Sequence, residues 1–188
     1  ARMAPVTRTI LIVTVAIYLL QTIAEPAFMA FALWPLGPYF RPWQIVTYAF
    51  LHGSPTHVFF NMFAVYMFGS ELERYWGARR YVFLYLSSIV FAAIAQLMVA
   101  GMSGGLYPTV GASGGVFGLL LVYAVLFPRR RLMLIFPPIP MPAWLFVTLY
   151  GVIELTMGLT GAQPGVAHFA HIGGMLGGFL ALLSFRAR

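Results

Sequence analysis

The chain has 188 residues, of which 61% are hydrophobic and 8% are charged, and its mean hydropathy is +0.89. Soluble domains carry roughly 25% charged residues, and a chain of this size buries only about 70% of the surface that it exposes when unfolded. This composition excludes an ordinary soluble domain and predicts an all-α, polytopic membrane protein. The absence of cysteine excludes disulfides and thiolate chemistry, so any catalysis must use hydroxyl, imidazole or carboxylate groups.

The formal net charge of +7 comes from arginine alone, because the chain contains no lysine. The arginines cluster between apolar stretches, and no basic stripe with interleaved aromatic residues lies outside those stretches. Nucleic-acid binding would need such a stripe. The charge pattern therefore indicates membrane topology, with anionic lipid as the partner and no nucleic acid.

Six apolar stretches are predicted to be transmembrane helices: residues 9–24, 56–70, 81–100, 113–127, 143–159 and 167–185. With the N-terminus in the cytoplasm, ten of the eleven arginines lie on the cytoplasmic side and only Arg41 lies outside. Both termini are therefore expected in the cytoplasm. The first stretch resembles a signal peptide in length, but five further spans favour a retained helix. We expect one domain over residues 1–188, without an internal repeat.

Two connections between the predicted helices are distinctive. Residues 25–55 form a long outer segment rich in proline and aromatic residues, a composition that suits the membrane interface. Residues 128–142 form an inner connector that is basic and contains several prolines, which oppose helix formation.

The fourth apolar stretch is too short to cross the whole hydrocarbon core. From Ser113 to Phe127 a helix is about 22 Å long, whereas the core is about 30 Å thick. Ser113 should therefore lie below the outer surface, preceded by an irregular, glycine-rich segment at residues 109–112. Irregular backbone at this depth is tolerated only against protein or in a wet cavity, so the sequence predicts water inside the membrane.

Polar residues lie near the start of the three predicted helices that run from the outer to the inner side. They are His57 and Asn61, then Ser113, then His168 and His171. His57 and Asn61 are four residues apart and share a helix face. Polar side chains within a membrane are costly and usually face the bundle interior, so their convergence predicts a functional site. A purely structural hydrogen-bond network is the alternative for His57 and Asn61.

Two pairs of glycines predict close packing of the fourth and sixth helices. Gly114 and Gly118 have the GxxxG spacing, as do Gly174 and Gly178. This spacing lets two helix backbones approach closely and would bring Ser113 near the sixth helix. GxxxG alone is common in membrane helices and mostly indicates packing, so the functional interpretation depends on the conjunction with the polar residues.

Three motifs then resemble those of the rhomboid intramembrane serine proteases, and the similarity covers the whole chain. Gly111-Ala112-Ser113-Gly114 is similar to the family's GxSG. His57-Val-Phe-Phe-Asn61 is similar to its HxxxN, and Ala170-His171-Ile-Gly-Gly174-Met-Leu-Gly-Gly178 is similar to its AHxxGxxxG. Their occurrence in this order is much more specific than any one of them alone.

The resemblance implies a six-helix rhomboid bundle that hydrolyses peptide bonds in or near transmembrane segments of other proteins. It implies Ser113 as nucleophile, His171 as general base, and an oxyanion hole from His57, Asn61 and the Ser113 backbone N–H. A serine hydroxyl needs such a neighbouring base. An aspartate-completed triad is impossible because the chain has no aspartate, so a Ser-His dyad is expected. No cofactor and no metal are expected.

The chain departs from the family pattern at two positions. Many relatives have a tyrosine four residues after the nucleophile, and this chain has Phe117, which retains a ring against the base or in the substrate pocket but lacks the hydroxyl. The pair Trp43-Gln44 lacks the arginine of the corresponding family pair. In addition, Glu154 lies deep in the fifth helix, where a carboxylate is either protonated or paired. A structural hydrogen bond and a gating role are both open for it.

Two other functions compete with the protease. A catalytically silent rhomboid-like protein would bind membrane clients, but such a protein normally lacks the nucleophile or the base. A small-solute channel or metal site could use His52, His57, His168 and His171. For a bacterial source we expect the inner membrane, with the active site opening to the outer side; an organelle membrane is the alternative. The sequence makes no prediction of oligomeric state.

Overall fold

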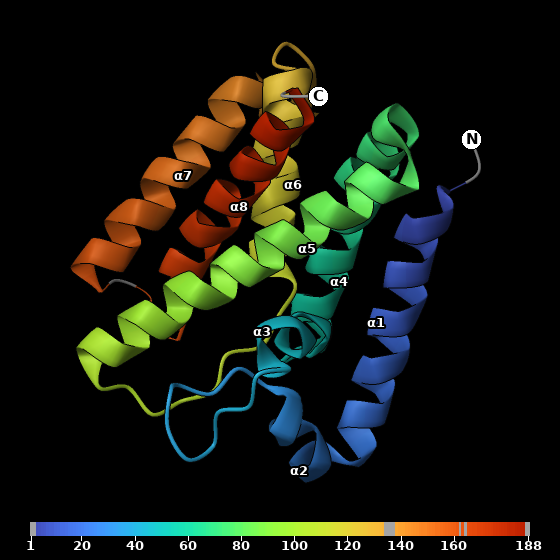
Figure 1. The fold of residues 1–188 in the computed structure, drawn as a ribbon. Helices are drawn as coiled ribbons and strands as arrows, with labels where there is room; N and C mark the ends of the chain where they lie inside the picture. Colours follow the sequence, from blue (N-terminus) through green and yellow to red (C-terminus); the bar gives the residue numbers. More distant parts are fainter. Residues whose placement is uncertain (1–2, 134–137, 162, 164, 187–188) are drawn as a thin grey trace.

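The computed structural model of the chain describes residues 3–133, 138–161, 163 and 165–186. Figure 1 shows its elements, which are helical apart from two short strands. In chain order they are α1 Pro5–Ile23, α2 Glu25–Phe28, η1 Met29–Phe31, α3 Gln44–Thr47, η2 Tyr48–Phe50, α4 Pro55–Ala64, η3 Val65–Gly69, α5 Ser70–Ser103, α6 Ser113–Leu126, β1 Arg131–Met133, β2 Pro140–Pro142, α7 Ala143–Thr160 and α8 His168–Arg186.

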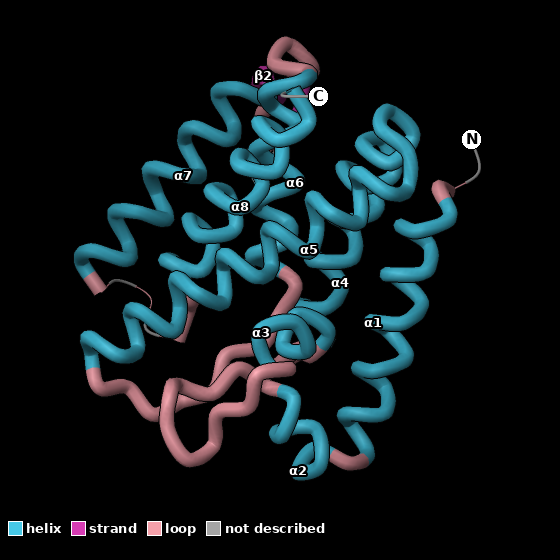
Figure 2. The backbone as a smooth tube through the Cα atoms, viewed as in Figure 1, coloured by secondary structure: helices cyan, strands magenta, loops and turns pink. Residues whose placement is uncertain are grey.

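The long helices form a bundle in which α5, α6 and α8 pack directly on one another. Helix α7 contacts α6 and α8, and α1 contacts α4 and α5. The start of α1, the strands and the end of α8 lie at one end of the bundle (Figure 1). Most of the loop backbone and the short helices α2 and α3 lie at the other end (Figure 2).

The distribution of side chains on α1 is the reverse of that in a soluble protein. Its buried residues are polar and recur every seven positions, at Thr7, Thr14 and Gln21. Many of its apolar residues point outward, and the most exposed are Ile12 at 61% and Ile23 at 84%, whereas Ile10 and Leu11 pack partly on the core. Such a helix is stable only when its outer face meets lipid. The protein is therefore an integral membrane protein.

Length and composition support the same conclusion for the rest of the described chain. Four helical runs are long and apolar enough to cross a membrane: Pro5–Ile23, Pro55–Ser103, Ala143–Thr160 and His168–Phe185. The second comprises α4, η3 and α5 and has 49 residues, about 73 Å at 1.5 Å per residue. Helix α6 is apolar but shorter, as the sequence predicts.

Helix boundaries agree with the sequence prediction to within a few residues, with one informative exception. The stretch predicted to end at residue 70 continues as helix until Gly77, where φ is +80°. A positive φ interrupts a right-handed helix and is readily adopted only by glycine. Gly77 therefore turns the chain between the predicted second and third helices. The range of α5, Ser70–Ser103, includes this turn because helical hydrogen bonds adjoin it on both sides.

The long outer segment folds into short helical turns rather than an extended coil. Buried Gln44 holds it together: its Oε1 accepts from the N–H groups of Trp34 and Arg41, and its Nε2 donates to the carbonyls of Ala30 and Tyr39. The amide thus ties together backbone from both sides of the loop. This explains how the segment is fixed without the arginine expected from the resemblance.

The inner connector differs from the prediction. Its described residues form no helix, as its prolines predict, but β1 and β2 pair in an antiparallel manner, with Leu132 opposite Met141. The all-α prediction is wrong for these six residues, because strands at a sheet edge tolerate proline. Two of the arginines predicted to be cytoplasmic, Arg2 and Arg188, and one proline of the connector, Pro137, lie outside the described part of the chain.

Glu73 is buried and caps the N-terminal end of α1. Its carboxylate accepts hydrogen bonds from the N–H of Val6 and from both the N–H and the hydroxyl of Thr7, all 2.8 Å long. These N–H groups have no partner within the helix, and a negative charge is favourable at that end. Glu73 is therefore a structural carboxylate that joins α1 to α5.

Candidate functional site

Ser113 is the first residue of α6, and the irregular segment before it is shaped by hydrogen bonds. Thr109 exchanges two backbone hydrogen bonds with Leu33, and the N–H of Gly111 donates to the carbonyl of Tyr48. Gly111 has φ +128°, and a Cβ there would lie 2.7 Å from Cε1 of His57. Only glycine therefore fits between the second predicted helix and the start of α6.

Contact between glycines sets the distance between α6 and α8. A Cβ on Gly174 would overlap the backbone carbonyl of Gly114, and a Cβ on Gly178 would lie 2.8 Å from the carbonyl oxygen of Gly118. The two helices thus meet backbone to backbone, as the GxxxG spacing predicts. This close crossing brings the start of α6 next to the first turn of α8.

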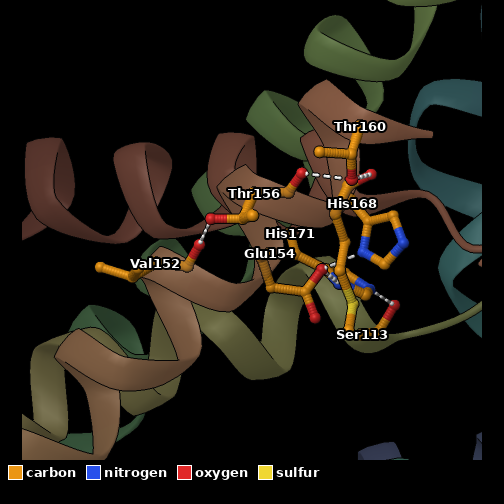
Figure 3. Close-up of polar contacts among 8 residues, drawn as sticks. Ser113, Val152, Glu154, Thr156, Thr160, His168 and His171 are labelled. Carbon is orange, nitrogen blue, oxygen red and sulfur yellow. Dashed lines mark hydrogen bonds and ion pairs between the residues drawn. The ribbon is translucent and has the colours of Figure 1, made fainter. Parts of the chain in front are cut away.

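Ser113 and His171 form a hydrogen bond across this crossing. The Oγ atom of Ser113 lies 2.8 Å from Nε2 of His171, and Figure 3 shows the two side chains pointing toward each other. His171 is buried, with 8% of its surface exposed. The sequence predicts this proximity, and the geometry suits proton transfer from the hydroxyl to the imidazole.

Glu154 of α7 contacts the other side of the same imidazole. Its Oε2 atom lies 2.8 Å from Nδ1 of His171 and 2.6 Å from Nδ1 of His168 (Figure 3). Glu154 is therefore paired, as expected for a carboxylate in the membrane. Sequence reasoning missed its contact with His171; the only signal was a glutamate deep in an apolar helix.

Phe117 covers one face of the His171 ring. The ring centroids are 4.4 Å apart and the planes are inclined by 14°, which is a stacked arrangement. Phe117 lies one helical turn after Ser113, so both side chains reach His171 from the same helix. The stacking expected of a tyrosine at this position is kept, and Glu154 and Ser113 hold the ring in its plane.

His57 and Asn61 lie on α4, beside the start of α6. The Ser54 hydroxyl caps α4 by accepting from the N–H of His57, and Pro55 occupies the first turn. Nδ1 of His57 accepts from the N–H of Gly53 at 3.4 Å, which leaves Nε2–H as a donor. Nδ2 of Asn61 is buried without a hydrogen-bond partner. Both side chains thus have a donor available for a further acceptor.

His52 stabilises the backbone that immediately precedes Ser113. Its side chain is fully buried, and its Nε2 accepts from the N–H of Ala112 at 3.4 Å. Gln21 of α1 hydrogen-bonds both the N–H and the carbonyl of His52. Burial, followed by the charge of nearby His57, lowers the pKa of His52 to about 4. His52 is therefore a neutral structural residue at neutral pH.

The cluster of Glu154, His168 and His171 has the donor types of a zinc site, with ligand atoms within 4.8 Å of one another. However, Oε2 lies only 2.6 and 2.8 Å from the two Nδ1 atoms. Tetrahedral zinc ligands at about 2.0–2.1 Å from the metal stand about 3.3 Å apart. These distances are those of hydrogen bonds, and Nε2 of His171 is directed at Ser113.

Comparison with known proteins identifies the family. Residues 39–188 match the model of the Rhomboid domain. The chain is 29% identical over 141 residues to rhomboid protease GluP of Bacillus subtilis, covering 74% of this chain and 25% of that protein. It is 31% identical over 145 residues to rhomboid protein 1, mitochondrial, of Saccharomyces cerevisiae, covering 73% and 40%.

A third relative, rhomboid protease GlpG of Yersinia pestis, is 31% identical over 119 residues, which is 62% of this chain and 41% of that protein. The matched regions thus span between a quarter and about two fifths of the relatives' own lengths.

Proposed function

The chain belongs to the rhomboid family, and from this premise we propose that it is an intramembrane serine endopeptidase. Ser113 is the nucleophile and His171 the general base in the hydrolysis of peptide bonds in or near transmembrane segments. The observation that carries the proposal is the 2.8 Å contact between Ser113 Oγ and His171 Nε2. A serine hydroxyl becomes an effective nucleophile when such a base accepts its proton. The names of the GluP and GlpG relatives, both proteases, support the same activity.

The reaction follows from the positions of the two side chains. Ser113 Oγ attacks the carbonyl carbon of the scissile bond as its proton passes to Nε2 of His171. The intermediate collapses when His171 gives that proton to the leaving amine, and an acyl group remains on Ser113. A water molecule, deprotonated by His171, then attacks the acyl carbon. As the acyl–oxygen bond to Ser113 breaks, His171 returns the proton to Ser113 Oγ and the second product leaves with its new carboxylate.

The oxyanion of the tetrahedral intermediate is stabilised by three donors: Nε2–H of His57, Nδ2–H of Asn61 and the backbone N–H of Ser113. The two side-chain donors are available in the resting site, since Asn61 Nδ2 is unpartnered and His57 contacts Gly53 through its other nitrogen. The N–H of Ser113 belongs to the first residue of α6, where the helix supplies no acceptor and the helix dipole favours negative charge. Each donor of this kind contributes about 100- to 1,000-fold to kcat.

The same proposal includes a six-span topology with both termini in the cytoplasm. The break at Gly77 divides the run from Pro55 to Ser103 into two spans, and α1, α6, α7 and α8 supply the others. The predicted cytoplasmic arginines support this orientation. The active site then opens toward the outer side, which is the periplasm if the protein resides in a bacterial inner membrane.

The substrates are transmembrane proteins whose cleaved segment unwinds locally. An extended peptide presents its carbonyl to Ser113, whereas a helix keeps it hydrogen-bonded. Gly114 and Gly115 do not shape this approach, because a Cβ on Gly114 would meet Ala92 and a Cβ on Gly115 would meet Tyr85, both on α5. From the family resemblance we expect a small residue before the scissile bond. A mutational scan of a cleaved substrate that finds no such preference would reject this part of the proposal.

Cleavage of a fluorogenic transmembrane peptide by detergent-purified protein tests the proposed activity. Wild type should cut the peptide in the presence of a chelator, whereas Ser113→Ala and His171→Ala should not. Inert wild type with a normal thermal melting curve, across several peptides, would favour a client-binding protein without catalysis. Loss of wild-type activity on chelation would favour the metal alternative.

A further inference from the structure

Glu154 is not part of the proposed Ser-His dyad, yet it contacts the base. The inference drawn from this contact rests on the proposed function. The Glu154 side chain comes from α7 and inserts between two histidines of α8, with only 8% of its surface exposed. In a Ser-His dyad no side chain binds Nδ1 of His171, the ring nitrogen that faces away from Ser113. Here the carboxylate contacts that nitrogen at 2.8 Å. We propose that Glu154 is a positioning residue that completes a Ser113–His171–Glu154 triad inside the membrane.

The charge state of Glu154 follows from the number of its donors. One oxygen atom, Oε2, lies within hydrogen-bond distance of two imidazole nitrogens, those of His168 and His171. An ionised carboxylate oxygen accepts both bonds, because it has two lone pairs and no hydrogen. A proton on Oε2 would leave one lone pair and require one imidazole to act as acceptor, and a proton on Oε1 would make Oε2 a neutral, weaker acceptor. The two contacts, 2.6 and 2.8 Å, have the short length of charge-assisted hydrogen bonds. The paired geometry therefore favours an anion that receives Nδ1–H from both rings.

This charge state determines which nitrogen of His171 acts as the base. When Nδ1–H donates to Glu154, Nε2 carries a lone pair and accepts the hydrogen of Ser113 Oγ, as the 2.8 Å contact requires. The opposite tautomer would direct an N–H at Ser113 and could not remove its proton. Glu154 thus selects the catalytically competent tautomer and orients the ring so that Nε2 points at Ser113 Oγ.

Glu154 also compensates the charge that develops during the reaction. The proton leaves Ser113, binds Nε2 and makes His171 a cation until the leaving amine takes that proton. The carboxylate keeps its negative charge throughout and accepts no proton. A fixed anion 2.8 Å from the imidazolium stabilises it strongly, because the site is buried and the local dielectric constant is low.

His168 holds the carboxylate in place. Its Nδ1 lies 2.6 Å from Oε2, and it precedes His171 by three residues, so that one turn of α8 presents both rings to α7. In a non-polar bundle an ionised carboxylate needs more than one donor. His168 therefore supports Glu154 without contacting Ser113, and it acts on catalysis only through the carboxylate.

A merely structural role for Glu154 is the alternative. Only Ala143, Val147 and Glu154 are buried on α7, so Glu154 is the buried polar side chain of this helix and contacts α8. If its function were to attach α7, loss of its charge would lower the melting temperature and leave the turnover of folded enzyme intact. In the triad, loss of the charge lowers kcat in protein that is still folded.

The test compares Glu154→Gln with a matched control, Glu73→Gln, in detergent-purified protein. Glutamine keeps the size of glutamate and removes its charge, and Glu73 is a buried carboxylate that joins α1 to α5 far from Ser113 in the chain. For Glu154→Gln we expect kcat to fall about 100- to 10,000-fold with little change in KM, as for loss of the carboxylate in other triads. Glu73→Gln should lower the melting temperature and leave kcat per folded molecule unchanged.

A second readout detects the hydrogen bond itself. The proton between an imidazole and a carboxylate gives a low-field proton resonance, which labelling with ¹⁵N-histidine assigns to Nδ1 of His171. The resonance should persist in Ser113→Ala, which lacks the nucleophile, and disappear in Glu154→Gln. The signal from His168 is identified by its loss in His168→Gln.

The outcomes separate this inference from the proposed function. If wild type cleaves and Ser113→Ala does not, while Glu154→Gln retains wild-type kcat, the dyad stands and the triad is wrong. If Glu154→Gln loses activity only in proportion to its unfolded fraction, the carboxylate is structural and the triad is again wrong. If folded wild type does not cleave at all, the proposed protease fails, and the His171 resonance alone then decides whether Glu154 positions the ring.

Discussion

The imidazole of His171 stacks on Phe117, with ring centroids 4.4 Å apart and planes inclined by 14°. Stacked rings of this kind gain about 0.5–1.5 kcal/mol beyond their burial. We predict that Phe117→Leu lowers kcat about 2- to 10-fold, because the imidazole of His171 loses the aromatic ring that stacks on one of its faces. Phe117→Tyr should stay close to wild type, because it keeps the ring. Steady-state cleavage of one peptide by all three proteins is the measurement, and full activity of the leucine variant would contradict the prediction.

Asn61 should be needed for turnover and dispensable for folding. Its buried Nδ2 has no partner in the resting protein, so the group contributes no hydrogen bond there and is available to the oxyanion. For Asn61→Ala we expect kcat to fall about 100- to 1,000-fold, the usual effect of losing one such donor. The melting temperature should change little. A loss of activity that merely follows a loss of folded protein would assign Asn61 a structural role.

The glycine contact between α6 and α8 predicts a large effect of one methyl group. In Gly174→Ala the new Cβ would overlap the carbonyl of Gly114, and relief of the overlap should cost about 1–3 kcal/mol and separate Ser113 from His171. Gly101→Ala is the matched control, because nothing lies within 4 Å of that position and alanine favours helix. Melting curves and cleavage rates in one detergent should show a deficit only for the first variant.

Burial of His52 makes stability depend on pH. Its pKa is about 4 in the folded protein, against an ordinary value of 6.5, so the unfolded chain binds the additional proton between these two pH values. Stability from this residue is therefore fully present above pH 6.5 and is lost as the pH falls toward 4. The full loss amounts to about 3 kcal/mol.

Comparison with His52→Gln isolates this effect. Glutamine retains an acceptor for the N–H of Ala112 but does not titrate. Melting temperatures of both proteins at pH 7 and pH 4.5 should show a larger fall for wild type than for the variant. Equal falls would show that His52 is not the residue responsible, and another titrating group would have to be sought.

The sequence predicts much of the fold because membrane helices reveal themselves through length and hydropathy. The GxxxG pairs also predict the α6–α8 crossing, since only glycine permits that backbone contact. From these features the meeting of Ser113 and His171 can be anticipated without a structure. The connections are harder: Gly77 ends a helix through a positive φ that composition does not encode, and the proline-rich connector pairs as strands.

The contact of Glu154 with His171 could not be predicted in the same way. Glu154 is on α7, which has no GxxxG pair; its two glycines that face α8, Gly151 and Gly158, are seven residues apart and are a weaker sequence signal for how α7 is rotated. Its position depends on the loop after α7 and on how the apolar faces of the two helices pack. A buried carboxylate indicates that a partner exists, but it does not indicate which histidine.

Covalent labelling of Ser113 tests the central claim most directly. A fluorophosphonate reacts with a serine only when the hydroxyl is activated, and mass spectrometry of the digested protein identifies the modified residue. We predict a single adduct on Ser113 in wild type, with loss of labelling in His171→Ala protein that a melting curve shows to be still folded. Labelling at another residue, or equal labelling of Ser113 in His171→Ala, would contradict the account.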